Sequence, residues 1–452
     1  MLYKVKKERL FTNHQLLALL WPLIIEQALG VLVGMADTVM VSSVGEAAIS
    51  GVSLVDMINQ LIITVFGALA TGGAVVTSQH LGAKRPEEAA RSAGQLVGLS
   101  GILGTAVAVF CLVTRTAQLR LFFGTISEDV MQACLIYFTI TALSFPFLAL
   151  YNAGAAIFRS TGNSAVSMKV SVLVNAINFC GNALCVFVLR MGVAGVAVPT
   201  LVSRAVGAVI ILSLAAKRDY VLRITPRTVT RLEGRTVRSI LYIGIPSAFE
   251  NSLFQLGRVL VVSMISLFGT VHISANAVAN NLDAVGCIVG NAMGLAMITV
   301  VGRCVGAQDF EQTKHYTKKL LLWDYIAQGT VNLLVLFFLN RILGMYTLSP
   351  ETRALSWTLV MIHNGVAILL WPAGFVLPNA LCAANDVRFT MVTSILSMIV
   401  WRMGLSWILC VNMGMGAVGV WLAMVVDWIC RVTCFVIRFA SGAWQKSAMK
   451  KV

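Results

Sequence analysis

The sequence predicts an all-α polytopic membrane protein in which twelve transmembrane helices form two six-helix lobes related by a pseudo-two-fold axis. Two properties of the composition and one internal repeat carry this prediction. Hydrophobic residues make up 58% of the 452 residues and charged residues only 12%, roughly half the charged fraction of a soluble domain. Apolar runs near the ~20 residues needed to cross a bilayer recur along the chain, and none alternates as a β-barrel strand does.

The internal repeat gives the number and orientation of the lobes. When the sequence is shifted by 224 residues, identical residues coincide without a gap: Pro22 with Pro246, Glu26 with Glu250, Gly45 with Gly269, Gly82 with Gly306 and Gly195 with Gly419. The chain is therefore close to two copies of one unit. Because each copy has an even number of spans, both copies keep the same orientation, and an axis along the membrane normal relates them.

Six apolar runs in each copy are long enough for one transmembrane helix each. In the first copy they lie near 14–42, 50–78, 93–114, 131–157, 167–189 and 193–214. In the second copy they lie near 239–268, 272–300, 317–339, 354–382, 390–411 and 416–438. We therefore predict an N-lobe at 1–214, a basic cytoplasmic linker at 215–238, and a C-lobe at 239–452 that ends in a short cytoplasmic tail.

Basic residues gather in alternate loops, which predicts the orientation of the chain. They precede the first span, follow the second and eighth, fill the linker and close the chain: Lys4, Lys6, Lys7, Arg9, Lys84, Arg85, Arg91, Lys217, Arg218, Arg223, Arg227, Arg231, Arg235, Arg238, Lys314, Lys318, Lys319, Lys446, Lys450 and Lys451. By the positive-inside rule, both termini are cytoplasmic, in a multi-pass protein of the plasma (inner) membrane. The net charge of +15 reflects this topology, and we expect no nucleic-acid partner.

The motifs that the sequence lacks argue against enzymatic activity. It contains no Walker A loop, no G-x-G-x-x-G between strand and helix, no H-E-x-x-H and no acidic pair for prenyl chemistry. The ten cysteines form no C-x-x-C and no metal-ligand spacing, and Cys430 and Cys434 are interpreted as packing residues. We therefore expect no enzyme, no metal site and no cofactor. The first apolar segment is too long for a signal peptide, and we expect it to remain in the chain.

Ionisable side chains occur inside the predicted spans, where a charge costs about 2.5–3.5 kcal/mol on insertion and usually faces a cavity or a partner. These residues are Glu26, Asp37, Asp56, Arg204, Glu250, Arg258, Asp283, Arg402 and Asp427. No basic residue in the first span is spaced to neutralise Glu26 or Asp37, which favours a function for both. Arg258 is a candidate partner of Asp56 or Asp283.

Several of these residues share helix faces with other polar side chains. Glu26 and Asp37 are eleven residues apart, about three turns, which places them ~16 Å apart along one face. Helical spacing defines three further faces: Asp56, Asn59 and Gln60; Asn276, Asn280 and Asp283; and Asn175, Asn178 and Asn182. We expect these faces to line one acidic cavity, although the last set fits helix–helix hydrogen bonding equally well. Asp56 and Asp283 are expected on opposite walls, where both attract a cationic substrate.

Arg402 and Asp427 are interpreted as a structural ion pair. They lie on neighbouring antiparallel spans, at depths of roughly 14 and 17 Å below the outer ends by the helical rise. A transport role for the two residues is the alternative.

Short motifs in both copies are characteristic of one family. They are Trp21–Ile24, Met35–Val41, Gly72-Gly73 and Gln79–Ala83 in the first two spans, Asn178–Asn182 and Gly192–Ala197 further on, and Ile245-Pro246 and Val305–Gln308 in the second copy. Together they resemble the motifs of multidrug and toxic compound extrusion (MATE) transporters. The resemblance covers nearly the whole chain. It implies two six-helix lobes around a central cleft, and export of organic, often cationic compounds in exchange for Na⁺ or H⁺.

The DinF-like and archaeal branch of that family fits best, through Asp37. In that branch a cation-linked site joins the first-span Asp to polar residues of spans five and six, which here are Asn178, Asn182 and Thr200. Because position 182 is Asn where that branch has Asp, Na⁺ would lose a charged ligand, and we expect H⁺ as the coupling ion. The tenth span has no acid, so the C-lobe Na⁺ site of the NorM-like branch is not reproduced.

We therefore predict a secondary antiporter that exports amphipathic, cationic organic compounds by alternating access of its two lobes. The predicted substrate cavity consists of Glu26, Asp56, Asn59, Glu250, Asn280 and Asp283. Its partners would be small molecules and the bilayer, and we expect a monomer. The alternative is a lipid-linked precursor flippase or polysaccharide exporter of the same superfamily, which would need a cationic cavity for phosphate headgroups.

Overall fold

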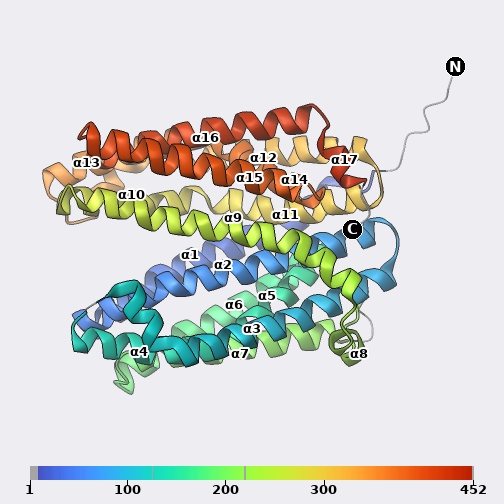
Figure 1. Cartoon of the computed structure of the whole chain (residues 1–452), viewed down its shortest axis with the longest axis horizontal. Helices are drawn as coiled ribbons and strands as arrows, with labels where there is room; N and C mark the ends of the chain where they lie inside the picture. Colours follow the sequence, from blue (N-terminus) through green and yellow to red (C-terminus); the bar gives the residue numbers. More distant parts are fainter. Residues whose placement is uncertain (1–8, 125, 218–219, 450–452) are drawn as a thin grey trace.

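The computed structural model describes residues 9–124, 126–217 and 220–449. All regular structure among these residues is helical, and the helices lie side by side in two halves (Figure 1). The predicted all-α architecture of two lobes is confirmed. Some of the residues used to predict orientation, Lys4, Lys6, Lys7, Arg218, Lys450 and Lys451, lie outside the described residues.

The first half of the chain forms the lower lobe of Figure 1. Its elements are α1 (Asn13–Ser42), α2 (Glu46–Gly82), α3 (Pro86–Phe123), α4 (Glu128–Leu143), α5 (Phe145–Ser160), α6 (Ser164–Ala183), the π-helical turn η1 (Leu184–Val188) and α7 (Ala194–Ala215). Thr12 and Gln15 form a capping box that starts α1. The fourth predicted span is bent by 45° between α4 and α5, where Pro146 lies in the first turn of α5 and cannot continue the hydrogen-bond ladder of α4.

The second half forms the upper lobe, after the short linker helix α8 (Pro226–Thr230). Its elements are α9 (Gly234–Ser266), α10 (Thr270–Gly286), α11 (Ile288–Gly306), α12 (Phe310–Gly344), α13 (Pro350–Trp371), η2 (Pro372–Val376), α14 (Leu377–Ala383), α15 (Val387–Ser397), η3 (Met398–Leu405), η4 (Ile408–Asn412), α16 (Gly416–Ala440) and α17 (Trp444–Ala448). The three π-helical segments fall in the tenth and eleventh predicted spans.

Eleven of the twelve predicted spans meet the length and hydropathy expected of membrane helices. Ten helices qualify alone, and the bent pair α4–α5 adds one more. The remaining span corresponds to α9, which is 33 residues long and runs beside the others (Figure 1). Its hydropathy is lowered by Glu250, Asn251, Gln255 and Arg258, so the polar residues that make α9 of functional interest also weaken its membrane signature.

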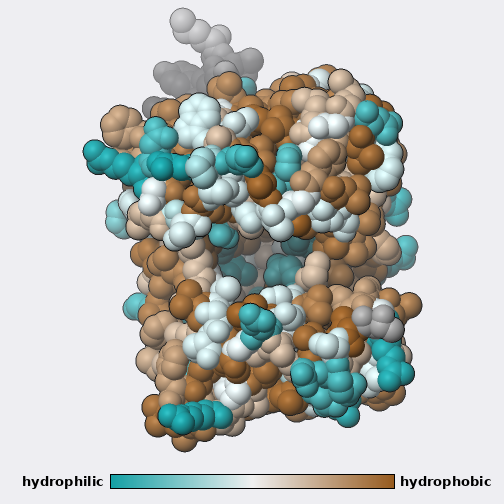
Figure 2. Space-filling view, turned by 90° about the vertical axis from the view of Figure 1, so that its left-hand side faces the viewer, coloured by the Kyte–Doolittle hydropathy of each residue, from teal (hydrophilic) through white to brown (hydrophobic). Residues whose placement is uncertain are grey.

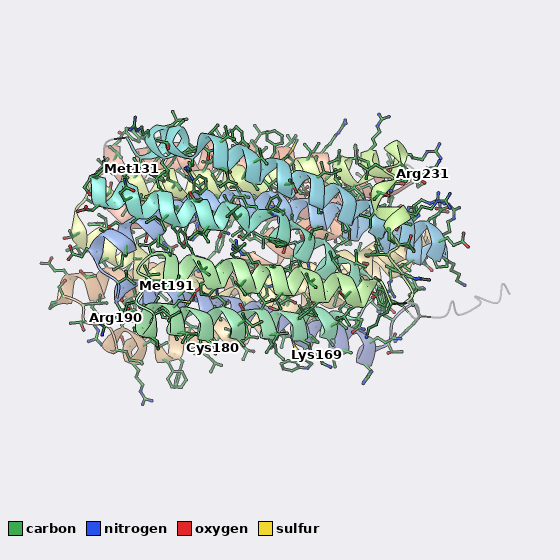
Figure 3. The ribbon with its side chains drawn as sticks, turned by 90° about the horizontal axis from the view of Figure 1, so that it is seen from below. Met131, Lys169, Cys180, Arg190, Met191 and Arg231 are labelled. Atoms are coloured by element: carbon green, nitrogen blue, oxygen red, sulfur yellow. The ribbon has the colours of Figure 1, made fainter. Side chains whose placement is uncertain are left out.

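The two ends of the bundle differ in their loops. Figure 3 views the molecule from below Figure 1 and shows Met131 and Arg190 at one end and Arg231 at the other. Lys169 and Cys180 lie on the outer surface of α6, and both are exposed. We call the end that holds α8 and α17 the linker end, and the opposite end the far end.

The lobes separate at the far end and join toward the linker end. Figure 2 looks at the far end and shows a central hollow between the halves with hydrophilic side chains on its walls. One buried apolar cluster, by contrast, contains residues of both lobes, such as Leu69 and Val75 with Ile240 and Val301. The molecule is therefore open at the far end, and its two lobes pack against each other nearer the linker end.

The junction depends on a close crossing of α2 and α11. A Cβ atom added at Gly82 would collide with the carbonyl oxygen of Arg303, and one added at Gly306 would collide with that of Gln79. Gly82 and Gly306 are equivalent in the repeat, as are Gln79 and Arg303. The pseudo-two-fold axis therefore passes through this contact, which we call the α2–α11 crossing.

Two side chains of the crossing bind the opposite lobe. Gln79 donates through Nε2 to the carbonyl oxygen of Ala383 at 2.8 Å, and Arg303 donates through Nη2 to that of Ser160 at 2.9 Å. Ala383 and Ser160 are the last residues of α14 and α5, where free carbonyl groups give a helix end its partial negative charge. The two hydrogen bonds therefore occupy equivalent places in the two lobes, but the donor is a neutral amide in the N-lobe and a cation in the C-lobe.

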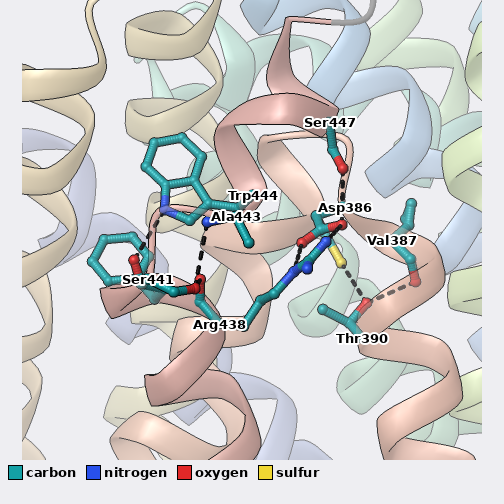
Figure 4. A network of polar contacts seen from close by, with 10 residues as sticks. Asp386, Val387, Thr390, Arg438, Ser441, Ala443, Trp444 and Ser447 are labelled. Carbon is teal, nitrogen blue, oxygen red and sulfur yellow. Dashed lines mark hydrogen bonds and ion pairs between the residues drawn. The ribbon is translucent and has the colours of Figure 1, made fainter.

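The turn that receives Gln79 is fixed by a polar network at the linker end (Figure 4). Gln79 also donates to Oδ1 of Asn385 at 3.0 Å. The neighbouring Asp386 accepts two hydrogen bonds from Arg438, at 2.7 and 3.0 Å, and one from Ser447 at 3.0 Å. The bidentate geometry orients both charged groups, so α15, α16 and α17 together hold the C-lobe side of the junction.

Replacing Gly82 or Gly306 by Ala is expected to lower the thermal unfolding midpoint of the purified protein. The new methyl group collides with the other lobe, and overpacking of this kind costs about 1–3 kcal/mol. Scanning fluorimetry in detergent measures the effect. The matched control is Gly67→Ala, also on α2, where a methyl group meets open space. Equal midpoints for Gly82→Ala and Gly67→Ala would contradict the close crossing.

Candidate functional site

The N-lobe brings the four predicted coupling residues into one hydrogen-bonded chain. Asn182 donates through Nδ2 to Oδ1 of Asp37 at 2.9 Å and to Oδ1 of Asn178 at 3.3 Å, and Asn178 donates to the hydroxyl of Thr200 at 3.0 Å. Asn178 and Asn182 are one helical turn apart on α6, so both face α1 and α7. Asn182 is fully buried and Asp37 partly so. Among the described residues, the hydrogen-bond partner of Asp37 is the neutral amide of Asn182.

Asp56 belongs to the same polar interior. It accepts hydrogen bonds from Asn59 at 3.2 Å and from the Tyr137 hydroxyl of α4 at 3.1 Å, and it lies close enough to Asp37 for the two charges to interact. Both hydrogen-bond donors to Asp56 lie within its own lobe, and Asp56 is exposed. The expectation that it faces the C-lobe across a central cavity stays a prediction.

Glu26 has a basic partner that the sequence analysis missed. Its carboxylate accepts a hydrogen bond from Ser167 at 2.9 Å and lies 3.4 Å from Nη1 of Arg159. Both charged side chains are mostly buried, at 12% and 14% exposed. Glu26 is therefore part of an ion pair between α1 and α5 and not an unpaired acid of a substrate cavity. Arg159 lies two residues beyond the predicted end of the fourth span, which is why it was overlooked.

Glu250, the repeat equivalent of Glu26, does line a cavity. It accepts a hydrogen bond from Ser394 of α15 at 2.5 Å, which parallels the bond from Ser167 of α6 to Glu26. The cavity has a volume of about 280 Å³ and lies mainly in the C-lobe, between α9, α11, α14 and α16. Besides Glu250, its polar lining consists of Thr71, Ser247, Asn251, Asn291, Asn379 and Arg431.

Asp283 is bound to a histidine that the sequence analysis did not consider. Oδ1 of Asp283 lies 2.9 Å from Nε2 of His363, and the Cys287 thiol donates to it at 3.0 Å. His363 is 2% exposed and Asp283 23%. Asn276 of the same helix accepts a hydrogen bond from Trp421, and Asn280 is partly buried. α13 thus supplies a partner for Asp283 within its own lobe, and the expectation that Asp283 opposes Asp56 across the cleft stays a prediction.

Asp427 pairs with Arg431 and not with the predicted Arg402. Nε of Arg431 lies 3.0 Å from Oδ1 of Asp427, one turn along α16, and both side chains are buried. Ser397 also donates to this carboxylate. Arg402 instead lies over the ring of Phe254, 5.9 Å from its centroid. Arg258, the candidate partner of Asp56 or Asp283, forms no ion pair with either within 4 Å, as far as the described residues extend.

Asp324 of α12 was also missed. It is fully buried, and neither of its carboxylate oxygens has a hydrogen-bond partner among the described residues. An ionised carboxylate is costly to bury in such surroundings, because no hydrogen bond replaces its lost hydration. Asp324 and His363 could have been found by the rule that identified the other residues, since each is a polar residue inside an apolar run.

Within the described residues, one group of three side chains offers ligand atoms of the kind that metals bind: Asp283, Cys287 and His363. Their contacts of 2.9 and 3.0 Å are hydrogen-bond distances. Ligand atoms around a tetrahedral metal, each at ~2.0–2.3 Å from it, would stand farther apart. We therefore assign the three groups to a hydrogen-bonded cluster.

Comparison with known proteins places the chain in a family. The MatE family profile matches residues 22–184 and again residues 246–408, which together make up more than half of the chain. The chain belongs to the MatE family. The two MatE matches are equal in length and begin 224 residues apart, in the register of the internal repeat.

This MatE family member resembles bacterial proteins along nearly its full length. It is 27% identical to "Uncharacterized transporter YisQ" of Bacillus subtilis, over 97% of this chain and 96% of that protein. It is 24% identical to "Probable multidrug resistance protein NorM" of Thermotoga maritima, over 99% and 96% of the two chains. Its fold matches a solved outward-facing MATE family multidrug transporter with a TM-score of 0.89, at 20% identity over 96% of both chains.

Replacing Arg431 by Ala is expected to lower the stability of the protein strongly, because it leaves Asp427 buried without its cation. Breaking a buried pair in this way costs about 3–5 kcal/mol. Thermal unfolding of purified variants measures the loss. The control is Lys314→Ala, which breaks the pair with Glu311, whose side chain is 89% exposed and which should contribute at most about 1 kcal/mol. Similar losses in both variants would contradict the assignment of the buried pair.

Proposed function

We propose that this MatE family member is a secondary antiporter that exports organic compounds in exchange for H⁺. The observation that carries the proposal is the environment of Asp37. Its carboxylate is held by the amide of Asn182 and has no basic group within 4 Å among the described residues, whereas Glu26, Asp386 and Asp427 each have an arginine. No fixed cation therefore competes with a proton for the Asp37 carboxylate, as is required of a coupling residue.

The hydrogen-bonded residues from Asp37 to Thr200 can transmit a change in the protonation of Asp37. An ionised Asp37 accepts the hydrogen bond from Asn182, but a protonated one becomes a donor itself and can bond to a different acceptor. Asn182 is linked through Asn178 to Thr200 of α7, so protonation changes contacts on three helices. A proton suits this site better than Na⁺, because position 182 supplies no second charge. Of the neighbouring oxygens, those of Asn178 and Thr200 accept hydrogen bonds, and Oδ1 of Asn182 has no partner among the described residues.

We infer the orientation of the protein in the membrane from the positions of its basic residues. The linker end, with its arginines, faces the cytoplasm, and the hollow at the far end opens outside the plasma membrane. The names of the relatives support small organic substrates. We further propose lobes at 1–214 and 239–452 joined by the 215–238 linker, a monomer surrounded by lipid, and no nucleic-acid partner.

Export of a lipid-linked precursor or polysaccharide remains a second candidate because of one cavity. It lies at the linker end, has a volume of about 1000 Å³, and is lined by arginines that include Arg85, Arg91, Arg235, Arg238 and Arg388. These arginines could bind a phosphate headgroup as it enters. Transport assays with proteoliposomes separate the two candidates. If the protein exports an organic cation, and Arg388→Ala does not change the rate, the drug antiporter is favoured.

Asp37→Asn is expected to abolish gradient-driven export while the protein still folds, because the amide cannot exchange a proton. Efflux of a fluorescent organic cation from cells, with and without collapse of the pH gradient, measures the loss. Asp129→Asn removes an exposed acid at the far end and should leave efflux unchanged. Proton-coupled export by Asp37→Asn at the wild-type rate would remove Asp37 from the mechanism.

Asp56→Asn and Glu250→Gln are expected to weaken export of a cationic compound several-fold more than export of an uncharged compound of similar shape. Glu250 lines a cavity inside the C-lobe, and Asp56 is exposed on α2. Apolar helices around a carboxylate make its attraction for a cation stronger than in water. Initial transport rates of the matched pair provide the measurement. Asp129→Asn again serves as control, and equal losses for both compounds would show that neither carboxylate recognises charge.

A further inference from the structure

The large cavity at the linker end lies against the α2–α11 crossing. Gln79 and Gly306 of the crossing form part of its wall, and its volume is about 1000 Å³. The rest of its lining comes from both lobes: from the start of α3 in the N-lobe, from the first turns of α9, and from α15 and α17 in the C-lobe. A ligand in this cavity would therefore contact both lobes at the end where they are joined.

The charged lining of the cavity is dominated by arginine, with five arginines and two glutamates. Both glutamates are already engaged. Oε2 of Glu88 lies 3.1 Å from Nδ1 of His80 and 3.4 Å from Nη1 of Arg85. Oε2 of Glu233 lies 3.5 Å from Nη1 of Arg91. The acids of the lining therefore offset two of the five arginines, and an excess of positive charge remains.

The other three arginines converge from two helices. Arg235 and Arg238 are three residues apart in the first turns of α9, and Tyr242 follows four residues later, so the three side chains share one face. The guanidinium of Arg388, from α15, lies over the Tyr242 ring at 5.3 Å from its centroid, a cation–π contact. Within the described part of the chain, these three arginines have no carboxylate within 4 Å. Like charges held around one cavity repel each other, and a bound anion would relieve that repulsion.

The chemistry of the lining favours a phosphate group as this anion. Guanidinium groups bind phosphate oxygens through paired N–H donors, with a geometry that a lysine ammonium does not provide. A phosphate group presents oxygens in several directions, so it can bind arginines that reach it from different helices. Arg85 and Arg91 keep N–H donors free beside their glutamates, because each guanidinium has five. Orientation in the membrane requires basic residues at this end, but it does not require them to surround a cavity.

We propose that the linker-end cavity binds a phosphate-bearing anion, which connects Arg85 and Arg91 of the N-lobe with Arg388 of the C-lobe. The source is either the headgroup of an acidic phospholipid or a soluble phosphate compound. The anion stabilises the joined lobes beside the α2–α11 crossing, and it is a bound ligand and not the exported compound. This inference does not rest on the proposed function.

The test is the thermal unfolding midpoint of the purified full chain, stripped of lipid in a neutral detergent. A ligand that binds the folded state raises the midpoint by mass action. One arm adds inorganic phosphate, with chloride at the same ionic strength as control. The other arm adds phosphatidylglycerol, with phosphatidylcholine as control. A rise with phosphatidylglycerol alone assigns the lipid headgroup, and a rise with inorganic phosphate assigns the phosphate group itself as the ligand.

Variants locate the site and test whether it joins the lobes. Arg388→Gln in the C-lobe and Arg85→Gln in the N-lobe should each raise the apparent Kd of the active probe about tenfold, because each removes a charged donor. The matched control is Arg227→Gln, which removes an exposed arginine of α8 at the same end but outside the cavity, and it should keep the wild-type Kd.

Three results would overturn the proposal. The first is a midpoint that neither probe raises above its control. The second is an equal loss in Arg227→Gln and Arg388→Gln, which would show general attraction to the basic end. The third is a wild-type Kd in Arg85→Gln, which would show that the anion does not connect the lobes. None of these readouts requires transport, so a chain that binds the anion but exports no drug would refute the proposed function and not this site.

Discussion

The backbone contact at the α2–α11 crossing is the constraint on which the rest of the structure depends. Two glycines at equivalent repeat positions let helices from opposite lobes touch, and Gln79 and Arg303 bind the ends of α14 and α5 beside them. A contact on the two-fold axis closes both lobes at once, because each lobe supplies the same surface. With the lobes joined there, the hollow between them lies at the far end (Figure 2).

The repeat preserves the scaffold more closely than the chemistry. Glu26 and Glu250 occupy equivalent positions, and each accepts a hydrogen bond from a serine. Glu26 is then neutralised by Arg159, whereas Glu250 lines a cavity. The same asymmetry appears at the crossing, where a neutral Gln79 corresponds to a cationic Arg303. Duplication thus supplied two lobes that fit each other, and substitution of the partners gave each lobe its own polar interior.

The sequence predicted the positions of helices better than the partners of their side chains. Apolar length and the repeat were sufficient for the lobes, and the chain of Asp37, Asn178, Asn182 and Thr200 forms as expected. Arg402 shows why pairing failed. Its depth was calculated with the regular helical rise, but it lies in the π-helical η3, whose wider turn rotates the following side chains. Two residues at the same depth in the membrane form a pair only if the rotation of each helix about its axis turns their side chains toward each other.

The acids inside the lobes divide by the partners that hold them, and this division bears on the coupling ion. Glu26 and Asp427 have arginines, whose charge is permanent, and we interpret both acids as structural. Asp37 is held by an amide, and Asp283 contacts a histidine and interacts with Arg258 at longer range. A transporter that used Na⁺ would need several oxygen ligands around such an acid. Near Asp37 the oxygens of Asn178 and Thr200 accept hydrogen bonds, Oδ1 of Asn182 has no partner among the described residues, and position 182 supplies no second charge. A proton would need only one acceptor, and Asp37 offers one.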